Sequence, residues 1–400
     1  MKLDILEKMI IFASERYLVY MKMDKKVVVF CGSGYHSLGL IRCLGEGGYR
    51  PECYCFGHKC DLFLSSRYIS KGRKFESAEA VLNFLLNDYP IYDDRPILLT
   101  IPDVPAFLVD QYQNQLSRKF IVMNAGEQGK LGYWMDKNNM NQMAQKHGLL
   151  IPWTIVLSKK EAIPEGIKYP VFTKSLRTVD GGKCDESICR NKAELEKKRK
   201  SIASDRFLVV EYIQKKYERN YFGIALKGKV YIDYYDAISR FPDGAFGYYG
   251  DIINCDHDDI WEKCVLMMKD TGYNGLFDIE FLEDVNGKLY FMEVNFRVDG
   301  GIYKVTPGVN LPAEWCRLVT MAQEDLPDNL TTKKKRFTGM TEVQDFKSSV
   351  VHGSMNPLKW IWQFCNTDKY MLLNLKDPMP VLVWLFTSSR RECTRFTSIS

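Results

Sequence analysis

The sequence predicts an α/β domain followed by a domain of α+β character, and three observations predict this order. Strand and helix signals alternate in the first third of the chain, strands dominate the middle, and a basic, tryptophan-rich segment follows. At 400 residues the chain is also too long for one ordinary domain. We expect an N-terminal extension at 1–24, a parallel-sheet domain at 25–134, a second domain at 135–330 and a C-terminal extension at 331–400.

The first domain is predicted from short apolar runs that precede helices. The run Val27–Phe30 ends in Gly32-Ser33-Gly34 and precedes helical spacing over Leu38–Leu44. The run Ile97–Ile101 precedes a helix-like stretch over Ala106–Leu116. This alternation predicts a parallel, doubly wound sheet. The glycine motif lacks the third glycine of a dinucleotide-binding fingerprint, so it is a weak indication of a nicotinamide site.

The second domain mixes strands and helices. A helix is expected from near Met135 through Lys146, ended by Gly148 and Pro152. Strands are expected at Thr154–Leu157, Val171–Lys174, Phe207–Glu211, Tyr221–Leu226 and Lys229–Asp236. Further helices are expected around Lys192–Ile202 and Asp259–Met268. The run from Lys333 to Arg336 is expected to link this domain to the C-terminal extension.

An acidic hairpin is the most informative part of the sequence. Two arms of alternating polar and apolar residues flank Asn286-Gly287, which favours a two-residue turn. The register that follows from this turn places Glu280 opposite Glu293 and Asp278 opposite Asn295. Directly opposed side chains have Cβ atoms about 4.5–5.5 Å apart, so two carboxylates repel unless a cation or a proton intervenes.

Carboxylate and amide oxygens suit Mg²⁺, so the hairpin predicts a magnesium site. The alternative is an exposed hairpin whose acidic face meets water. That alternative leaves the following Arg297 and Gly300-Gly301 unexplained.

The two arms resemble the metal-binding strands of ATP-grasp enzymes, such as carbamoyl-phosphate synthetase, biotin carboxylase and the D-alanine ligases. The matching residues are Phe277–Phe281 and Phe291–Arg297, and the whole resemblance covers about 27–318. It implies an ATP-grasp architecture with a pre-ATP-grasp domain in front. It also implies ATP and two Mg²⁺ ions, with Mn²⁺ as an alternative. The implied metal ligands are Glu280, Glu293 and Asn295.

Further motifs follow in the order of the family. Met135-Asp136-Lys137 resembles the start of the helix that carries the first phosphate-binding lysine, and Tyr169–Lys174 resembles the strand that carries the second. Asp180–Lys183 is similar to the flexible phosphate loop, although it is not an obvious glycine-rich run. Val210–Ile213 resembles the hinge that reads adenine. The resemblance implies these nucleotide-binding residues: Lys137, Lys174, Gly181, Gly182, Glu211, Tyr212, Ile213 and Glu218.

The activity that the resemblance implies is ligation of a carboxylate to an amine through an acyl phosphate, with release of ADP and phosphate. Arg297 and Lys174 are implied as catalytic, with Arg297 as the candidate donor to the tetrahedral oxyanion. Asp236 is expected either to orient the amine or to cap its strand. Tyr35 and His36 are expected either to touch the substrate or only to form a turn.

The substrates are expected to be small molecules, either amino acids or cell-envelope precursors as in ligases resembling D-aspartate ligase, but the sequence names neither partner. The first alternative is a degenerate ATP-binding regulatory protein. The complete set of metal ligands argues against it. A carboxylase that uses a biotin carrier is a second alternative, and nothing in the sequence resembles the carrier.

The C-terminal extension carries eleven Lys and Arg against five Asp and Glu, a charge of +6. Since the whole chain has +5, the remainder has −1, which argues against nucleic-acid binding. Pro357–Phe364 and Pro380–Phe386 combine tryptophan, aliphatic and cationic residues, and Arg390-Arg391 follows. This composition is typical either of a lid packed on the body or of peripheral membrane contact through 357–391.

Charges in the first twenty residues break the apolar core that a signal peptide needs. Translation from Met1, Met21 or Met23 remains open. Twelve scattered cysteines without a CxxC pair favour reduced thiols. We therefore expect a cytoplasmic protein, with membrane association as the alternative.

Overall fold

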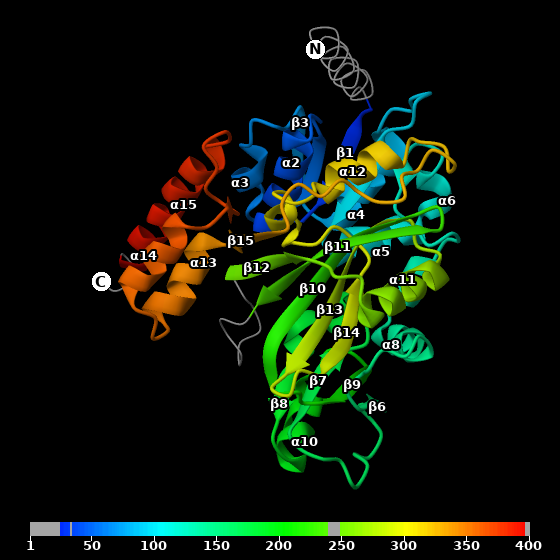
Figure 1. Ribbon diagram of the computed structural model, residues 1–400, viewed down its shortest axis with the longest axis vertical. Helices are drawn as coiled ribbons and strands as arrows, with labels where there is room; N and C mark the ends of the chain where they lie inside the picture. The colour runs from blue at the N-terminus through cyan, green and yellow to red at the C-terminus, as the bar shows by residue number, and fades with distance from the viewer. Residues whose placement is uncertain (1–24, 33, 239–248, 397–400) are drawn as a thin grey trace, which may run out of the picture.

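The computed structural model describes residues 25–32, 34–238 and 249–396, with side chains placed for all of these except 181–183 and 388–396. The three expected translation starts, Met1, Met21 and Met23, lie outside the described residues. The described chain forms three β-sheets with helices around them, and the C-terminal helices lie along one side (Figure 1).

The first sheet contains five parallel strands in the order β3-β2-β1-β4-β5. Its strands are β1 (Val27–Cys31), β2 (Glu52–Phe56), β3 (Lys71–Phe75), β4 (Ile97–Ile101) and β5 (Ile121–Val122). Val27 and Val29 of β1 enter one hydrophobic core, while Val28 and Phe30 enter another. Both faces of the sheet are therefore covered, which confirms the predicted doubly wound arrangement.

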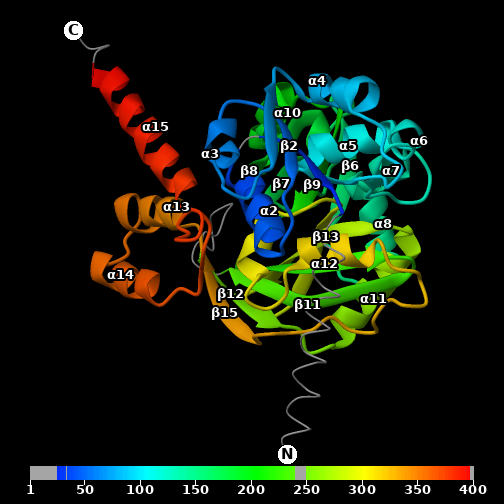
Figure 2. The same ribbon diagram turned by 90° about the horizontal axis from the view of Figure 1, so that it is seen from above.

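Six helices and one π-helical turn of the described chain surround this sheet. They are α2 (Tyr35–Glu46), α3 (Cys60–Leu64), α4 (Ala78–Asn83) with the π-helical continuation η1 (Phe84–Asp88), α5 (Asp103–Gln111), α6 (Gln113–Leu116) and α7 (Lys130–Trp134). The Ser77 side chain caps α4 by accepting from the Ala80 N–H at 3.1 Å. Figure 2 shows these helices on both sides of the strands.

The second sheet is antiparallel, with four strands in the order β6-β9-β7-β8. The strands are β6 (Thr154–Ser158), β7 (Val171–Ser175), β8 (Ser187–Cys189) and β9 (Arg206–Glu211). Helix α10 (Lys192–Ser201) packs on it through the fully buried Leu195, and the Asn191 side chain caps the helix.

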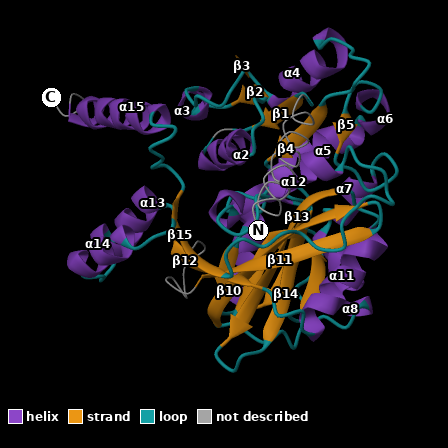
Figure 3. Ribbon diagram, turned by 45° about the horizontal axis from the view of Figure 1, so that its top comes forward, coloured by secondary structure: helices purple, strands orange, loops and turns teal. Residues whose placement is uncertain are grey.

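The third sheet has seven strands in the order β14-β13-β10-β11-β12-β15-β16. They are β10 (Lys215–Leu226), β11 (Lys229–Ile238), β12 (Tyr249–Asn254), β13 (Gly275–Asp284), β14 (Leu289–Asn295), β15 (Arg336–Met340) and β16 (Lys369–Tyr370). Helices α8 (Lys137–Lys146), α11 (Asp259–Thr271) and α12 (Leu311–Leu318) pack beside it (Figure 3). The expected linker from Lys333 runs directly into β15, because Arg336 already pairs with Ile253 of β12.

The C-terminal extension adds two strands to the large sheet and then forms helices. These are α13 (Glu342–Phe346) with the π-helical η4 (Lys347–Val351), α14 (Pro357–Cys365) and α15 (Met379–Phe396). Its three tryptophans differ in environment. Trp360 stacks on Phe364 at 5.2 Å between ring centroids, Trp384 packs against the main core, and Trp362 is 66% exposed.

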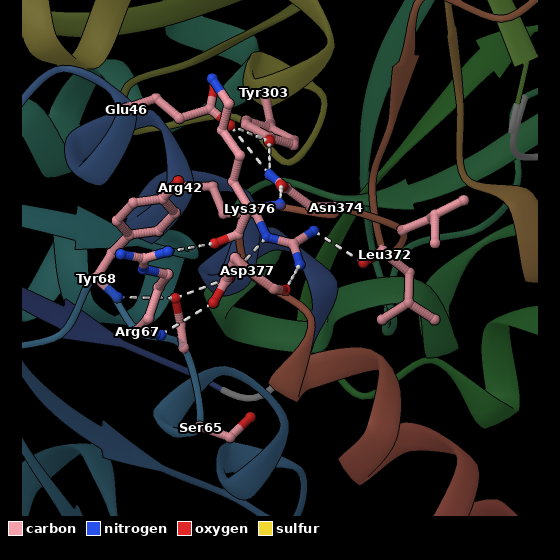
Figure 4. A network of polar contacts seen from close by, with 12 residues as sticks. Arg42, Glu46, Ser65, Arg67, Tyr68, Tyr303, Leu372, Asn374, Lys376 and Asp377 are labelled. Carbon is pink, nitrogen blue, oxygen red and sulfur yellow. Dashed lines mark hydrogen bonds and ion pairs between the residues drawn. The ribbon is translucent and has the colours of Figure 1, made fainter.

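The segment 369–377, which we call the strap, ties this extension to the first domain. Arg42 of α2 is fully buried, and its Nε lies 3.0 Å from Asp377 Oδ2. The same guanidinium donates to the main-chain oxygens of Met371, Leu372 and Asp377 at 2.7–3.0 Å. The side chain of Asn374 in the strap donates to the Tyr303 hydroxyl. That hydroxyl in turn donates to Glu46 Oε1 at 2.6 Å (Figure 4).

Candidate functional site

The hairpin of β13 and β14 places its polar side chains in facing pairs. Glu280 lies opposite Glu293, and Asp278 lies opposite Asn295, as the sequence predicts. The Asn295 side-chain amide donates to Glu280 Oε1 at 2.7 Å and to Asp278 Oδ2 at 3.3 Å. One amide therefore links two carboxylates of the neighbouring strand.

The turn of this hairpin differs from the prediction by one residue. The Asp284 N–H donates to the Lys288 oxygen at 2.9 Å, so Val285–Gly287 form a three-residue loop with Gly287 at φ +80°. A β-bulge at Met292, which has no partner residue opposite, takes up the difference. The expected two-residue turn is wrong, yet the predicted register holds at the carboxylates because the bulge restores it.

The two facing glutamates differ in charge. Burial, with the nearby charge of Glu293, raises the pKa of Glu280 from 4.5 to about 8. Burial also acts to raise the pKa of Glu293, but the charges of Lys137 and Lys174 outweigh it and lower that pKa. The pair therefore favours one negative charge over two when only protein groups surround it.

Lys137 is the first residue of α8, and the Asp136 side chain caps this helix by accepting from the Asn138 N–H at 2.9 Å. Lys137 Nζ lies 3.0 Å from Glu293 Oε2 and donates to Thr178 Oγ1 at 3.1 Å. Burial alone would lower the pKa of Lys137, but Glu293 outweighs burial and raises it. The ammonium is thus held charged beside Glu293.

Lys174 projects from the fourth position of β7 and is 8% exposed. Its Nζ donates to the main-chain oxygen of Met292 at 3.3 Å. The bulged residue of the hairpin therefore supplies the acceptor for the second lysine. Burial lowers the pKa of Lys174, and the charge of Glu293 opposes this only in part.

Arg297 follows β14 and is fixed by two carboxylates. Its Nε lies 2.9 Å from Asp103 Oδ1, and its Nη1 lies 3.0 Å from Asp299 Oδ2. Asp103 is the first residue of α5, so a carboxylate of the first domain forms an ion pair with this arginine. Burial opposes the charge on Arg297, but Asp103 and Asp299 raise its pKa above the ordinary value.

The turn after Arg297 lies against helix α2. A Cβ on Gly300 would meet His36 Nδ1 at 1.6 Å, so only glycine permits this approach. The charge of His36 also helps Arg297 to lower the pKa of Asp299, against the effect of burial. The structure thus brings His36 to the same turn, next to the arginine.

Asp236 lies within β11 and pairs with Lys304 of η3 (Ile302–Val305), with both side chains buried. Asp236 Oδ1 has no hydrogen-bond partner among the described residues. A Cβ on Gly250 would lie 1.8 Å from that oxygen, and one on Gly339 would lie 2.7 Å from Lys304. These two glycines face each other on β12 and β15, so they make room for the buried ion pair.

The residues predicted to read the nucleoside lie where β9 leads into β10. Glu211 ends β9, and its Oε2 accepts from the Trp153 N–H at 3.3 Å. The Tyr212 N–H donates to the Pro170 oxygen at 3.3 Å, and Ile213 precedes β10. Glu218 forms an ion pair with Lys215, and burial raises the pKa of Glu218 above its ordinary value.

The predicted phosphate loop has a different local structure. Thr178–Gly181 form the helical turn α9, and Gly182–Asp185 form the 3₁₀ turn η2. Arg177 Nε lies 2.9 Å from Asp180 Oδ2 and holds the start of the segment. The segment expected to be a flexible phosphate loop therefore forms two helical turns, and a phosphate-binding role for Gly181 and Gly182 stays a prediction.

The hairpin's carboxylate and amide oxygens are of the kind that binds Mg²⁺ in proteins. Among the described residues, no three His, Cys, Asp or Glu side chains are grouped so as to hold a metal ion. Mg²⁺ commonly takes only one or two carboxylates and completes its coordination with phosphate and water. Glu280, Glu293 and Asn295 supply such a set, and Asp278 Oδ1 is buried without a described hydrogen-bond partner.

Four residues at this site were not predicted from the sequence. Two of them are Asp299, which holds Arg297, and Lys304, which pairs with Asp236. Asp103 follows β4, and polar residues at the carboxyl ends of parallel strands are typical of binding sites, so its position carries a usable signal. Thr178, which accepts from Lys137, has no comparable signal in its local sequence.

Solved structures share the arrangement of this chain. An L-amino acid ligase from Bacillus licheniformis aligns with a TM-score of 0.56 at 14% identity over 73% of each chain. An N5-carboxyaminoimidazole synthetase from Staphylococcus aureus complexed with ADP aligns with a TM-score of 0.63 at 14% identity, over 83% of this chain and 86% of that chain. A biotin carboxylase–β,γ-ATP complex from Campylobacter jejuni aligns with a TM-score of 0.58 at 18% identity, over 79% and 75%.

The sequence itself matches no model of a protein family and no curated protein. At these identities the structural likeness establishes a common fold.

Proposed function

Because this chain has the ATP-grasp fold, we propose that it is an ATP-dependent ligase that joins a carboxylate to an amine through an acyl phosphate. The observation that carries the proposal is the paired hairpin. Glu280 faces Glu293 there, and two lysines and Arg297 converge on the same strands. Buried charges with shifted pKa values cluster at functional sites, which favours a catalytic role for this hairpin.

Substrate ATP would lie with its phosphates beside Lys137 and Lys174. Both ammonium groups approach β14, which also bears the acidic side chains. Glu211 would accept from the adenine amine, with Tyr212 and Ile213 alongside, and Glu218 would accept from the ribose hydroxyls. Gly181 and Gly182 would offer main-chain N–H groups to the phosphates. These roles follow from the resemblance and from position along β9 and β10.

Glu280, Glu293 and Asn295 would hold magnesium, as two Mg²⁺ ions or with Mn²⁺ in their place. Bound there, the metal would neutralise charge on the transferring phosphoryl group. Burial and Glu293 raise the pKa of Glu280 to about 8, so a bound cation would favour release of its proton.

Lys137 and Lys174 would offset the negative charge of the phosphates while the substrate carboxylate attacks the γ-phosphate. This attack breaks the bond between the γ-phosphorus and the β–γ bridging oxygen, gives the acyl phosphate and releases ADP. The amine then attacks the acyl phosphate, and phosphate leaves. Arg297, held by Asp103 and Asp299, would donate to the oxyanion that forms at the carbonyl carbon. A guanidinium fixed from two sides loses little freedom at that moment.

The substrate carboxylate and amine would lie near Gly300-Gly301, where the absence of side chains leaves the main chain accessible. The approach of His36 to Gly300 makes the first domain a wall of this region. Asp236, paired with Lys304, would act by shaping this wall, because its side chain is only 1% exposed.

The test is ATP-dependent hydroxamate formation with hydroxylamine as the amine, across a panel of amino acids and small carboxylates. Glu293→Gln is expected to lower the rate by about 100-fold or more, because one metal ligand loses its charge. Glu324→Gln changes an exposed glutamate and is the matched control, with an unchanged rate.

Acid-dependent hydroxamate that disappears in Glu293→Gln would support the ligase. The alternative function, a nucleotide-binding regulatory protein, predicts that ATP binds but that no acid yields hydroxamate or ADP. That result, with ATP binding intact in the unchanged chain, would contradict the proposal.

A further inference from the structure

Exposed apolar side chains gather on the C-terminal extension. Helix α14 has one such row at helical spacing, with Leu358 at 75%, Ile361 at 50% and Trp362 at 66% exposure. On α15, Leu382 and Phe386 are spaced by one turn and are also exposed. The exposed large hydrophobic residues between α13 and the middle of α15 are Phe346, Val351, Leu358, Ile361, Trp362, Leu373, Leu375, Met379, Leu382, Leu385 and Phe386.

These exposed rows do not belong to a core that the described chain leaves incompletely packed. The opposite face of α14 is partly covered, because Trp360 stacks on Phe364 and contacts Phe346 at 4.9 Å between ring centroids. The Trp360 indole N–H also donates to Asp345 Oδ2 at 2.7 Å. The outer face of the helix therefore has no partner within the described chain.

The exposed, unpaired charges around these rows are positive. Lys347, Lys359 and Lys376 are exposed, and none of them forms an ion pair with a described residue. The acids of the same region are hidden or paired. Glu342, Asp345 and Asp377 are buried and hydrogen bonded, and Asp368 lies beside Lys334. The surface thus presents apolar side chains together with free cations.

We propose that α14 and the first turns of α15 rest on the surface of an anionic lipid bilayer. Leu358, Ile361 and Trp362 would enter the boundary between headgroups and acyl chains, and Lys347 and Lys359 would meet anionic headgroups. Tryptophan, leucine and lysine side by side on a helix suit this interface. This inference is independent of the ligase activity proposed above.

The charge pattern favours a bilayer over the other occupants. Two copies of this chain joined by a twofold axis would bring their unpaired lysines close together, which disfavours association. None of the described helices is both long and apolar enough to cross a bilayer.

The extension is also held firmly enough to act as a docking face. Arg42 binds the strap between α14 and α15. Movement of the two helices away from the body would therefore break a buried ion pair. In all three ribbon views α14 and α15 lie along the same side of the molecule, away from α11 (Figures 1–3).

The test is co-sedimentation of the full chain with vesicles of phosphatidylcholine alone and of phosphatidylcholine mixed with phosphatidylglycerol. We expect binding to the mixed vesicles that weakens with salt. Trp362→Glu is expected to reduce it about tenfold or more, and Lys359→Gln about fivefold at low salt. Leu266→Glu on α11, which replaces a residue of 53% exposure, is the matched control and should bind as the unchanged chain does.

A second readout measures the unchanged chain directly and uses a conservative variant to locate the contact. Brominated phosphatidylcholine in the mixed vesicles should quench the fluorescence of the unchanged chain, and Trp362→Phe should remove most of that quenching. Recovery of the unchanged chain in the supernatant with both vesicles would overturn the proposal. Equal binding to both vesicles would also overturn it. A dimer in solution that Trp362→Glu abolishes, without vesicle binding, would assign the face to a second copy.

Discussion

Replacing Arg42 with methionine should destabilise the chain strongly, although Arg42 lies outside the candidate active site. The guanidinium is fully buried and has four described acceptors, which are Asp377 Oδ2 and three main-chain oxygens of the strap. Methionine keeps much of the apolar stem but leaves these acceptors without their donor.

The magnitude follows from what remains around Asp377. Removing one partner of a buried ion pair costs about 3–5 kcal/mol. Here the Ser66 hydroxyl and the Arg67 N–H still donate to the carboxylate, both at 2.9 Å. We therefore expect a loss near the lower end, about 3 kcal/mol in the free energy of unfolding.

Urea unfolding, followed by the tryptophan fluorescence of the whole chain, measures this loss. Arg67→Met is the matched control, because the exposed side chain of Arg67 makes a single hydrogen bond to the strap, to the Lys376 oxygen, while the main-chain N–H that donates to Asp377 stays in place. It should cost about 0.5 kcal/mol or less. A double-mutant cycle with Asp377→Asn should show strong coupling to Arg42. A loss below about 1 kcal/mol for Arg42→Met, or additive effects in the cycle, would refute the reasoning.

Three further predictions concern the body of the molecule. Asp103→Asn should lower kcat/KM for hydroxamate formation about tenfold, because it removes one of the two carboxylates that hold Arg297; an unchanged value would show that Asp299 suffices. Gly250→Ala should cost about 1–3 kcal/mol in urea unfolding, since its Cβ would strike Asp236 Oδ1, and no loss would mean that the ion pair readily moves. Burial raises the pKa of Asp233 from 3.8 to about 6, so the folded state disfavours its charged form and loses stability as the pH rises through that range. Asp233→Asn should therefore melt higher than the unchanged chain at pH 7, by an amount that shrinks toward pH 4.

The acidic hairpin was predictable because its information is local. Alternation of polar and apolar residues gave the faces of both strands, and the turn signal gave a register. The turn is one residue longer than predicted, and the bulge at Met292 offsets it, so the facing of Glu280 and Glu293 was correct for an incomplete reason. No local signal in Phe291–Val294 marks the bulge.

Contacts between residues far apart in the sequence could not be predicted from the local pattern of polar and apolar residues. The ion pair of Asp103 and Arg297 joins residues 194 positions apart. Hydrophobic periodicity carries no information about contacts at that separation. The same holds for the extension. Its tryptophans were noted, but nothing local indicated that Arg336 would begin a strand of the large sheet.

The ion pair of Arg42 and Asp377 also dictates the order in which the chain can be completed. These residues are 335 positions apart, so at roughly 5–20 residues per second the arginine leaves the ribosome about 17–67 s before its partner. During that interval α2 carries an uncompensated cation on a side that is destined for burial. The first domain to be synthesised is therefore among the last to be finished, and a chain that ends before Asp377 would leave the buried guanidinium of Arg42 without its carboxylate partner.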